Sequence, residues 1–273
     1  MSKDISIQNL RKVFKTDDSE VVAVEDLSLD VKAGELVSIL GPSGSGKTTI
    51  LRLIAGLTEP TSGKVMLGDR ESREPGPDRG MVFQDFALFP WRSVRKNVEF
   101  GLELVSVIEE PEEGSAVPKK LWDRKGLPKE ERRELAEKAI ELVGLTKFAD
   151  ARIHELSGGM KQRVGIARAL VTNPDVLLMD EPFGALDAQT RNIMQTSLLN
   201  ILDKTDQTIL FVTHSVDEAC FLSDRIVILT KRPARIKEII EIPWAHPRDR
   251  AAPEFTALRK RILKELEEEN VMD

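Results

Sequence analysis

A glycine-rich stretch with a lysine and a threonine at fixed spacing, GPSGSGKT at 41–48, is the first candidate for chemistry. It fits G-x-x-x-x-G-K-[ST] at every fixed position, a pattern whose backbone N–H groups curl around phosphate oxygens. Lys47 is expected to reach the outer phosphates of a nucleotide and Thr48 to hold Mg²⁺. The alternative is an ordinary glycine turn before a helix.

Two acidic residues, Asp180 and Glu181, close the apolar run in DVLLMDEP. Adjacent carboxylates at the end of a buried strand repel each other unless a cation sits between them. Asp180 is therefore expected to hold Mg²⁺ through its water shell, and Glu181 to orient or deprotonate a water molecule that attacks the last phosphate. A solvated strand end is the alternative, and the glycine loop in the same chain weighs against it.

Two further polar residues end apolar runs, Gln84 in GMVFQ and His214 in TILFVTH. The amide of Gln84 can touch both Mg²⁺ and the attacking water, and His214 can hydrogen-bond a γ-phosphate. Taken alone, an exposed glutamine carries no signal and a capping histidine is the commoner case. His154 and His246 have no metal-ligand spacing and are interpreted as structural.

A second helix start that could face an anion lies in LSGGMKQR, residues 156–163. Ser157 can cap a helix that begins near Gly158, and Gly158 with Gly159 allows close backbone approach to an anion that the helix dipole favours. An ordinary capped helix is the alternative. Because the loop at 41–48 already has a lysine, a metal ligand and a candidate base, the second helix start is expected to cover the nucleotide from a neighbouring molecule. Two copies, arranged head to tail, would each contribute half of two ATP sites, and bound ATP would hold the pair together.

An apolar cluster in DFALFPW follows Gln84 and gathers Phe86, Leu88, Phe89 and Trp91 in a predicted loop. A large apolar group outside regular structure indicates a surface that docks a partner. The alternative is that these side chains fold into a local core.

Composition bounds the class of protein. The chain has 273 residues, near the upper limit for a single core, and a net charge of −6, which argues mildly against a general nucleic-acid binder. The single cysteine, Cys220, cannot form an internal disulfide and fits a reducing compartment. No apolar run reaches the roughly 18 residues of a membrane span, and the N-terminus lacks the apolar core of a secretion signal. A cytosolic protein that reaches a membrane only through a partner is expected.

The elements that must position these residues alternate between strands and helices. This alternation around a glycine loop predicts an α/β sheet with crossover helices, largely parallel in its centre. Residues 90–170 have no strand pattern and are expected to form a helical lobe, with an exposed, partly disordered insertion at 106–128. Expected strands are 5–10, 21–31, 36–40, 64–68, 80–84, 175–180, 208–213, 224–230 and 234–242, and expected helices are 47–56, 94–104, 129–145, one from 158, 189–203, 215–222 and 253–269.

Together these motifs resemble the nucleotide-binding subunit of an ABC transporter, over roughly 1–245 and in the family's order. The correspondence covers the Walker A loop Gly41–Thr49, the Q-loop at Gln84, the signature LSGGMKQ, the Walker B strand Val176–Asp180 with Glu181, the D-loop ALD at 185–187 and the switch histidine His214. The resemblance implies a P-loop ATPase core with a mostly parallel central sheet, an N-terminal antiparallel β subdomain, a helical subdomain at about 90–170 and a short helical tail at 246–273.

The resemblance also implies a set of site residues. Glu181, His214, Gln84 and Lys47 would be catalytic, and Thr48, Gln84 and Asp180 would bind Mg²⁺. The family usually stacks a tyrosine on adenine, but this chain has no tyrosine, and Phe14 takes that assignment. Residues expected to contact ATP are Phe14, Gly41, Pro42, Ser43, Gly44, Ser45, Gly46, Lys47, Thr48, Thr49, Ser157, Gly158, Gly159, Gln162 and Asp187.

Finer features, VFQDFALFPWRSVRKNVEFGLE and DEPFGALDAQTR, are similar to importers of nitrate, sulfonate and taurine, a subgroup that includes bicarbonate and pyrimidine-precursor importers. The implied protein hydrolyses ATP at the cytoplasmic face of the inner membrane. Its implied partners are two transmembrane permease subunits, a solute-binding protein and a second copy of itself or a paralogous cassette, with no nucleic acid. The solute stays open.

Two other classes were weighed. A non-transport ABC ATPase acting on ribosomes or DNA usually has two cassettes or a very long insertion, and this chain has neither. A nucleotide-gated binding module that does not hydrolyse ATP is disfavoured by Glu181 and His214. The segment 106–128 is interpreted as a solvated insertion, with an accessory contact as the alternative, and the acidic KELEEEN end as a solvated helix end.

Overall fold

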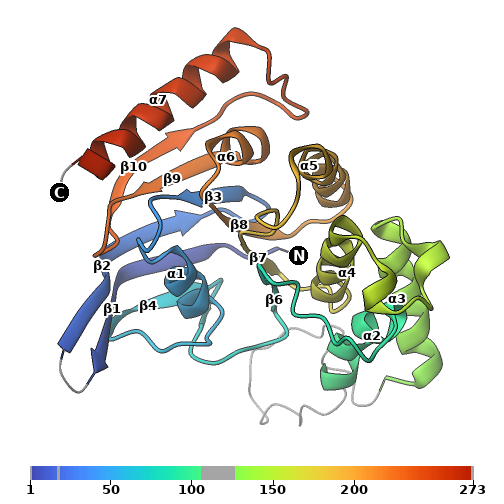
Figure 1. Ribbon diagram of the computed structural model, residues 1–273. Coiled ribbons are helices and arrows are strands. Elements are labelled where there is room, and N and C mark those ends of the chain that lie inside the picture. Colours follow the sequence, from blue (N-terminus) through green and yellow to red (C-terminus); the bar gives the residue numbers. More distant parts are fainter. Residues whose placement is uncertain (1, 17–18, 106–126, 272–273) are drawn as a thin grey trace.

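The computed structural model describes residues 2–16, 19–105 and 127–271. Most of the predicted insertion, 106–126, lies outside the described residues. Two sheets organise the fold (Figure 1). The N-terminal sheet is antiparallel, with the order β2-β1-β4-β5. Its strands are β1 Ile5–Thr16, β2 Ser19–Val31, β4 Ser62–Leu67 and β5 Arg70–Glu71.

The second sheet has six strands in the order β10-β9-β3-β8-β7-β6 and is parallel except for β10, which pairs antiparallel with β9. Three central strands are buried at every position, as mainly apolar strands covered on both faces should be. Its strands are β3 Leu36–Leu40, β6 Arg79–Val82, β7 Val176–Asp180, β8 Thr208–Thr213, β9 Arg225–Leu229 and β10 Ile236–Glu241.

Alternate side chains of this sheet enter two different hydrophobic cores, because successive residues of a strand point to opposite faces. In β7, Leu177 and Met179 belong to one core, whereas Val176 and Leu178 belong to the other. The second core is covered by α1 (Lys47–Ile54) and the N-terminal sheet. The first is covered by α4 (Gly158–Leu170), α5 (Ala188–Leu202) and α6 (Val216–Leu222). Helices α1 and α4 therefore lie on opposite faces of the sheet (Figure 1).

Helices α2 (Val94–Val105) and α3 (Lys129–Leu142) pack against α4, beside the short turns η2 (Thr146–Phe148) and η3 (Ile153–Glu155) (Figure 1). Within the described part of 90–170 the model has no strand, only an isolated bridge between Ser93 and Arg152. Buried residues of α2 and α3 belong to the same core as the sheet face behind α4. The helices thus extend that core outward from the sheet.

Helix α7 (Pro253–Val271) runs along β10 and contacts α6 (Figure 1). Its Phe255 and Ile262 are fully buried in the core. The expectation of a solvated acidic end is wrong in part, because Nζ of Lys237 on β10 lies 3.2 Å from carboxylate oxygens of both Glu265 and Glu269. Lys237 thus pairs with two of the acidic residues near the end of α7, and these two are not simply solvated. Across the described residues, none of the helices is long and apolar enough to cross a bilayer.

Candidate nucleotide-binding site

The glycine loop joins the buried end of β3 to the start of α1, as the sequence predicted. Gly44 and Gly46 have φ of 75° and 103°, values that residues with a side chain rarely adopt. A Cβ on Gly46 would stand 2.8 Å from the carbonyl oxygen of Ala23. Gly46 caps α1 without any side-chain hydrogen bond, so the first N–H groups of the helix remain available to an anion.

Lys47 folds back into this loop. Its Nζ donates to the carbonyl oxygens of Gly41 (2.8 Å) and Pro42 (2.7 Å), and its side chain is buried. Burial lowers the pKa of Lys47, and the carboxylates of Glu181 and Asp180 act in the opposite direction. The ammonium group is therefore held by two weak acceptors at the centre of the loop, where phosphate oxygens would be stronger ones.

Thr48 and Asp180 come from different elements and meet. The hydroxyl of Thr48 donates to Oδ1 of Asp180 at 3.1 Å. Burial raises the pKa of Asp180, the hydrogen bond from Thr48 lowers it, and Glu181 raises it further. No group of three or more metal-ligating His, Cys, Asp or Glu side chains occurs among the described residues. A hydroxyl with one carboxylate suits Mg²⁺, which keeps several waters and takes few protein ligands.

Glu181 follows β7 with a φ of 42°, an uncommon value for a residue with a side chain. Its N–H donates to the carbonyl of Val212 in the neighbouring strand, at 2.9 Å. Its Oε2 lies 2.8 Å from Nδ1 of His214. Strained backbone of this kind persists where surrounding contacts impose it, and it gathers at functional sites.

Gln84 joins this group from the loop after β6. The position that a Cβ of Gly184 would take lies 3.7 Å from Nε2 of Gln84 and 3.8 Å from Oε2 of Glu181. The amide of Gln84 and the carboxylate of Glu181 thus both lie beside Gly184. Sequence reasoning placed Gln84, Glu181 and His214 at strand ends, and the fold brings them together.

The second predicted anion-facing helix start forms as expected, but on the other face of the sheet. Ser157 caps α4, with its Oγ accepting from the N–H of Met160 at 3.3 Å. Gly158 is exposed and Gly159 is buried. A Cβ on Gly159 would stand 2.9 Å from Cγ2 of Thr190, so this glycine is required for packing against α5.

Gln162 does not suit its predicted role. Its side chain is fully buried inside the fold, and its Oε1 and Nε2 have no hydrogen-bond partner among the described residues. Gln162 was predicted to belong to the signature, but it lies on the same helix face as Gly159, which packs against α5. A side chain buried in this way does not reach a nucleotide bound beyond the helix start.

Asp187 and Phe14 remain at the surface. Asp187 caps α5, with Oδ1 accepting from the N–H of Thr190 at 3.0 Å, and hydrogen bonds from Thr190 lower its pKa. The ring of Phe14 on β1 is 43% exposed, and Nζ of Lys12 lies 5.1 Å from its centroid. A ring this exposed leaves room for a stacking partner.

Residues 85–91 form the aromatic loop. The sequence left open whether its apolar side chains form a local core or stay exposed, and the structure has some of each. Phe89 joins a local core, with its ring centroid 4.6 Å from that of Phe100 and its backbone N–H and C=O both bonded to the side chain of Asn97. Leu88 packs against the main core. Trp91, by contrast, is 70% exposed.

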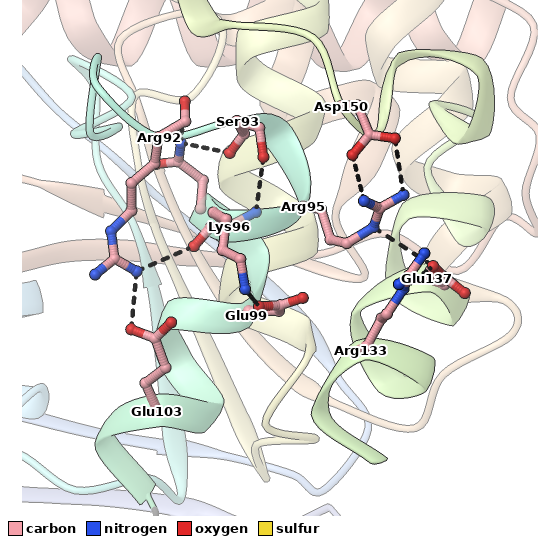
Figure 2. Close-up of polar contacts among 10 residues, drawn as sticks. Arg92, Ser93, Arg95, Lys96, Glu99, Glu103, Arg133, Glu137 and Asp150 are labelled. Carbon is pink, nitrogen blue, oxygen red and sulfur yellow. Dashed lines mark hydrogen bonds and ion pairs between the residues drawn. The ribbon is translucent and has the colours of Figure 1, made fainter. Parts of the chain in front are cut away.

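A cavity of about 470 Å³ opens beside Trp91. Charged side chains of α2 and its preceding loop are paired beside it: Arg92 with Glu103 at 2.8 Å and Lys96 with Glu99 (Figure 2). Asp150, from the turn after η2, pairs with Arg95 of α2. Residues that line the cavity are Trp91, Arg92, Ser93, Lys96, Glu103, Asp150 and Arg152.

Sequence reasoning missed Arg168, which fixes the aromatic loop from α4. Its guanidinium donates to the carbonyls of Phe86 (3.0 Å) and Ala87 (2.5 Å), two residues with positive φ. Burial lowers the pKa of Arg168. An arginine within the apolar run of α4 was the available signal, because a partly buried guanidinium requires hydrogen-bond acceptors.

Comparisons with known proteins agree with this geometry. The family model described as ABC transporter matches residues 24–184. An ABC transporter ATP-binding protein of Methanocaldococcus jannaschii is 51% identical, over 98% of this chain and 93% of its own length. The nitrate import ATP-binding protein NrtD of Synechococcus elongatus is 44% identical, over 92% of this chain and 87% of its own. The taurine import ATP-binding protein TauB of Roseobacter denitrificans is 42% identical, over 97% and 96%.

Solved structures carry the same architecture. A dimeric ATP-binding cassette in a post-hydrolysis state, bound to ADP and Pi, is similar with a TM-score of 0.71 and 31% identity, over 88% of this chain and all of that one. A second dimeric ABC transporter cassette gives 0.72 and 32%. The family match spans more than half of this chain. In the fold of this chain, the glycine loop lies against the end of β7 through the hydrogen bond of Thr48 to Asp180. The chain therefore belongs to the ABC transporter family and is one of its ATPases.

Proposed function

We propose that this chain is the ATP-hydrolysing subunit of an importer for a small solute, an anion such as nitrate, sulfonate, taurine or bicarbonate. Residues 1–245 form the ATPase and 246–273 a tail. Relatives named for nitrate and taurine import, each 42% identical or more across most of the chain, support this proposal. The bicarbonate transport protein CmpC of Synechococcus elongatus, 44% identical over 96% of this chain, adds to it.

Hydrolysis is assigned to the residues that converge at the ends of β3, β7 and β8. Lys47 and the amides of 41–49 bind the phosphates of ATP. Thr48, Asp180 and Gln84 would hold Mg²⁺, which neutralises phosphate charge when bound. Glu181 orients the attacking water and takes its proton, and His214 fixes the carboxylate through the 2.8 Å contact. Phe14 stacks on adenine. The convergence of Lys47 at the start of α1 with Asp180 and Glu181 at the end of β7 is the observation that carries this assignment.

A second copy completes the site. Because α1 and α4 lie on opposite faces of the sheet, the helix start at Ser157 does not cover the glycine loop of its own chain. Ser157 and the N–H groups of Gly158 and Gly159 would instead contact the ATP held by a partner, with Asp187 at the same interface. The dimeric state of the two similar solved cassettes supports this arrangement.

The aromatic loop and the cavity beside Trp91 are proposed to contact two transmembrane permease subunits, which act with a solute-binding protein. An exposed tryptophan next to a charged cavity is the kind of anchor that carries binding energy at interfaces. This chain would then be peripheral at the cytoplasmic face of the inner membrane, held there through its partners, and would bind no nucleic acid.

Solution mass tests the shared site. The Glu181→Gln variant is expected to be a monomer without nucleotide and a dimer with saturating Mg-ATP, measured by light scattering. Adding Ser157→Arg should abolish the dimer while leaving ATP binding to the glycine loop intact, because only the covering helix is changed. A dimer that persists in the double variant, or a Glu181→Gln variant that stays monomeric with ATP even in the presence of its permease, would contradict the proposal. Stimulation of ATPase activity by nitrate, taurine or bicarbonate in the assembled complex then identifies the solute.

A further inference from the structure

A buried carboxylate lies next to the proposed site without belonging to it. Glu218 on α6 is 4% exposed. Its Oε2 accepts from the hydroxyl of Thr213 at 2.6 Å, and its Oε1 lies 3.7 Å from Nε of Arg191. No step of the proposed hydrolysis uses this carboxylate.

On one side, Glu218 holds the two residues that flank His214. Thr213 precedes His214 and donates its hydroxyl proton to Glu218. The same hydroxyl oxygen accepts from the N–H of Ser215, at 3.0 Å, and Oγ of Ser215 accepts from the N–H of Glu218, at 3.4 Å. The hydroxyl of Thr213, which is bound to the carboxylate of Glu218, therefore fixes the backbone on both sides of His214.

On the other side, the ion pair reaches the loop that leads into α5. Arg191 on α5 donates from its guanidinium to the carbonyl of Leu186 at 2.9 Å. Leu186 directly precedes Asp187, the capping residue proposed to stand at the interface with a second copy. The ion pair between the buried Glu218 and the partly exposed Arg191 thus connects the loop of His214 to the loop of Asp187.

Packing alone does not explain a charge at this position. Helix α6 already buries five apolar side chains in the core and has its N-cap from Ser215. Burial raises the pKa of Glu218, and the hydrogen bond from Thr213 and the charges of Arg191 and His214 oppose that rise. A partly exposed ion pair gives little net stability, whereas the hydrogen bond from Thr213 fixes the geometry of the buried carboxylate.

We infer that Glu218 is a positioning residue for ATP hydrolysis, which sets the backbone around His214 through Thr213 and holds the Asp187 loop in register through Arg191. This inference rests on the roles proposed above for His214 and Asp187. Through Glu218, the loops of His214 and Asp187 would move together when a second copy approaches either of them. The consequence is a residue that changes the rate of the chemical step without touching nucleotide.

Steady-state kinetics test the inference first. Glu218→Gln keeps the shape of the side chain and removes its charge. We expect kcat to fall about tenfold to a hundredfold, since small misplacements at a site have effects of that size, with KM for ATP changed less than about twofold. The matched control is Glu269→Gln, which removes another buried and paired carboxylate, on α7. It should leave kcat unchanged.

Three measurements separate positioning from general stability. In the His214→Ala background, Glu218→Gln should lower kcat by a clearly smaller factor than in wild type, because the part of its effect that passes through His214 is then absent. Thr213→Ser, which keeps the hydroxyl, should retain most activity, and Thr213→Val should resemble Glu218→Gln. The chain has only three histidines, so the ring signals of His214 can be followed by NMR. Glu218→Gln should move those of His214 and leave those of His154 in place.

The outcomes are distinguishable. Wild-type kcat and unmoved His214 signals in Glu218→Gln, beside an impaired His214→Ala, would overturn the inference and leave the proposed function intact. Equal fold-losses from Glu218→Gln with and without His214 would also overturn it. A fully active His214→Ala would instead refute the role proposed for His214, and with it this inference.

Discussion

Oε2 of Glu181 lies 2.8 Å from Nδ1 of His214, although 33 positions separate the two residues in the chain. The reason is strand order. Glu181 follows β7 and His214 follows β8, and these strands are parallel neighbours whose ends meet at one edge of the sheet. The side chain of Glu181 is 21% exposed and that of His214 is 60% exposed. The pair is thus assembled but open to an approaching nucleotide or partner.

Removing the charge of Glu181 should stop turnover and leave nucleotide binding intact. In Glu181→Gln the amide keeps the size of the side chain but cannot accept a proton from water. We expect the rate of phosphate release to fall by about 10² to 10⁴. Glu241→Gln, at an exposed position on β10, is the control and should turn over normally. A Glu181→Gln rate within about threefold of wild type would remove Glu181 from the mechanism.

Two glycines of the phosphate loop should differ in their tolerance of a side chain. Gly46→Ala places a methyl group 2.8 Å from the carbonyl of Ala23 at a φ of 103°, so we expect it to abolish ATP binding and to destabilise the fold by about 2 kcal/mol or more. Gly44→Ala has the same kind of φ strain, at 75°, but no atom within 4 Å. It should cost about 1 kcal/mol and bind ATP more weakly. Calorimetric titration and urea unfolding of both variants give the comparison, and equal behaviour would contradict it.

Stability should fall at alkaline pH because of Cys220. Burial raises the pKa of this thiol from 9.0 to about 12. The folded chain therefore keeps a proton that the unfolded chain loses, and the free energy of unfolding decreases as pH rises from about 9 toward about 12. Urea unfolding at about pH 8 and about pH 10.5, for wild type and Cys220→Ala, isolates this effect as the difference between the two slopes. Parallel slopes would show that the thiol ionises equally in both states.

Helix α7 should contribute to global stability through its buried face. Phe255 is 2% exposed and Leu263 on the same helix is 38% exposed. Phe255→Ala is expected to lower the free energy of unfolding by about 3–5 kcal/mol, the usual cost of emptying a phenylalanine site in a core. Leu263→Ala should change it by less than about 0.5–1 kcal/mol. Thermal or urea unfolding measures both, and a mild Phe255→Ala would mean that α7 detaches independently of the core.

Trp91 should matter to the assembled transporter but not to the isolated chain. Its ring is 70% exposed, so Trp91→Ala removes little packing and should leave unfolding and basal ATPase activity unchanged. At an interface, an aromatic anchor of this kind contributes about 2 kcal/mol or more, so binding to the permease should weaken by about 30-fold. Ile239→Ala, at another exposed apolar position, is the control. Undiminished permease binding in Trp91→Ala would place the docking surface elsewhere.

The sequence by itself determined the features that local geometry imposes. The loop at 41–48 is recognisable because left-handed backbone requires glycine at set positions, here Gly44 and Gly46. Central strands such as β7 and β8 are recognisable because both of their faces are apolar. The helix start at Ser157 follows from a short side chain that caps its own backbone. Each of these signals spans fewer than about ten residues.

Tertiary structure alone decided which of these features meet. Strand order brings Glu181 to His214, and the alternation of side chains across one sheet sends α1 and α4 to opposite faces. Gln162 carries a polar side chain in a helix whose inner face only packing defines, so its burial could not be anticipated. The same holds for Lys237, which holds the acidic turn of α7. These relationships depend on contacts between residues far apart in the chain, which periodicity within a short window does not encode.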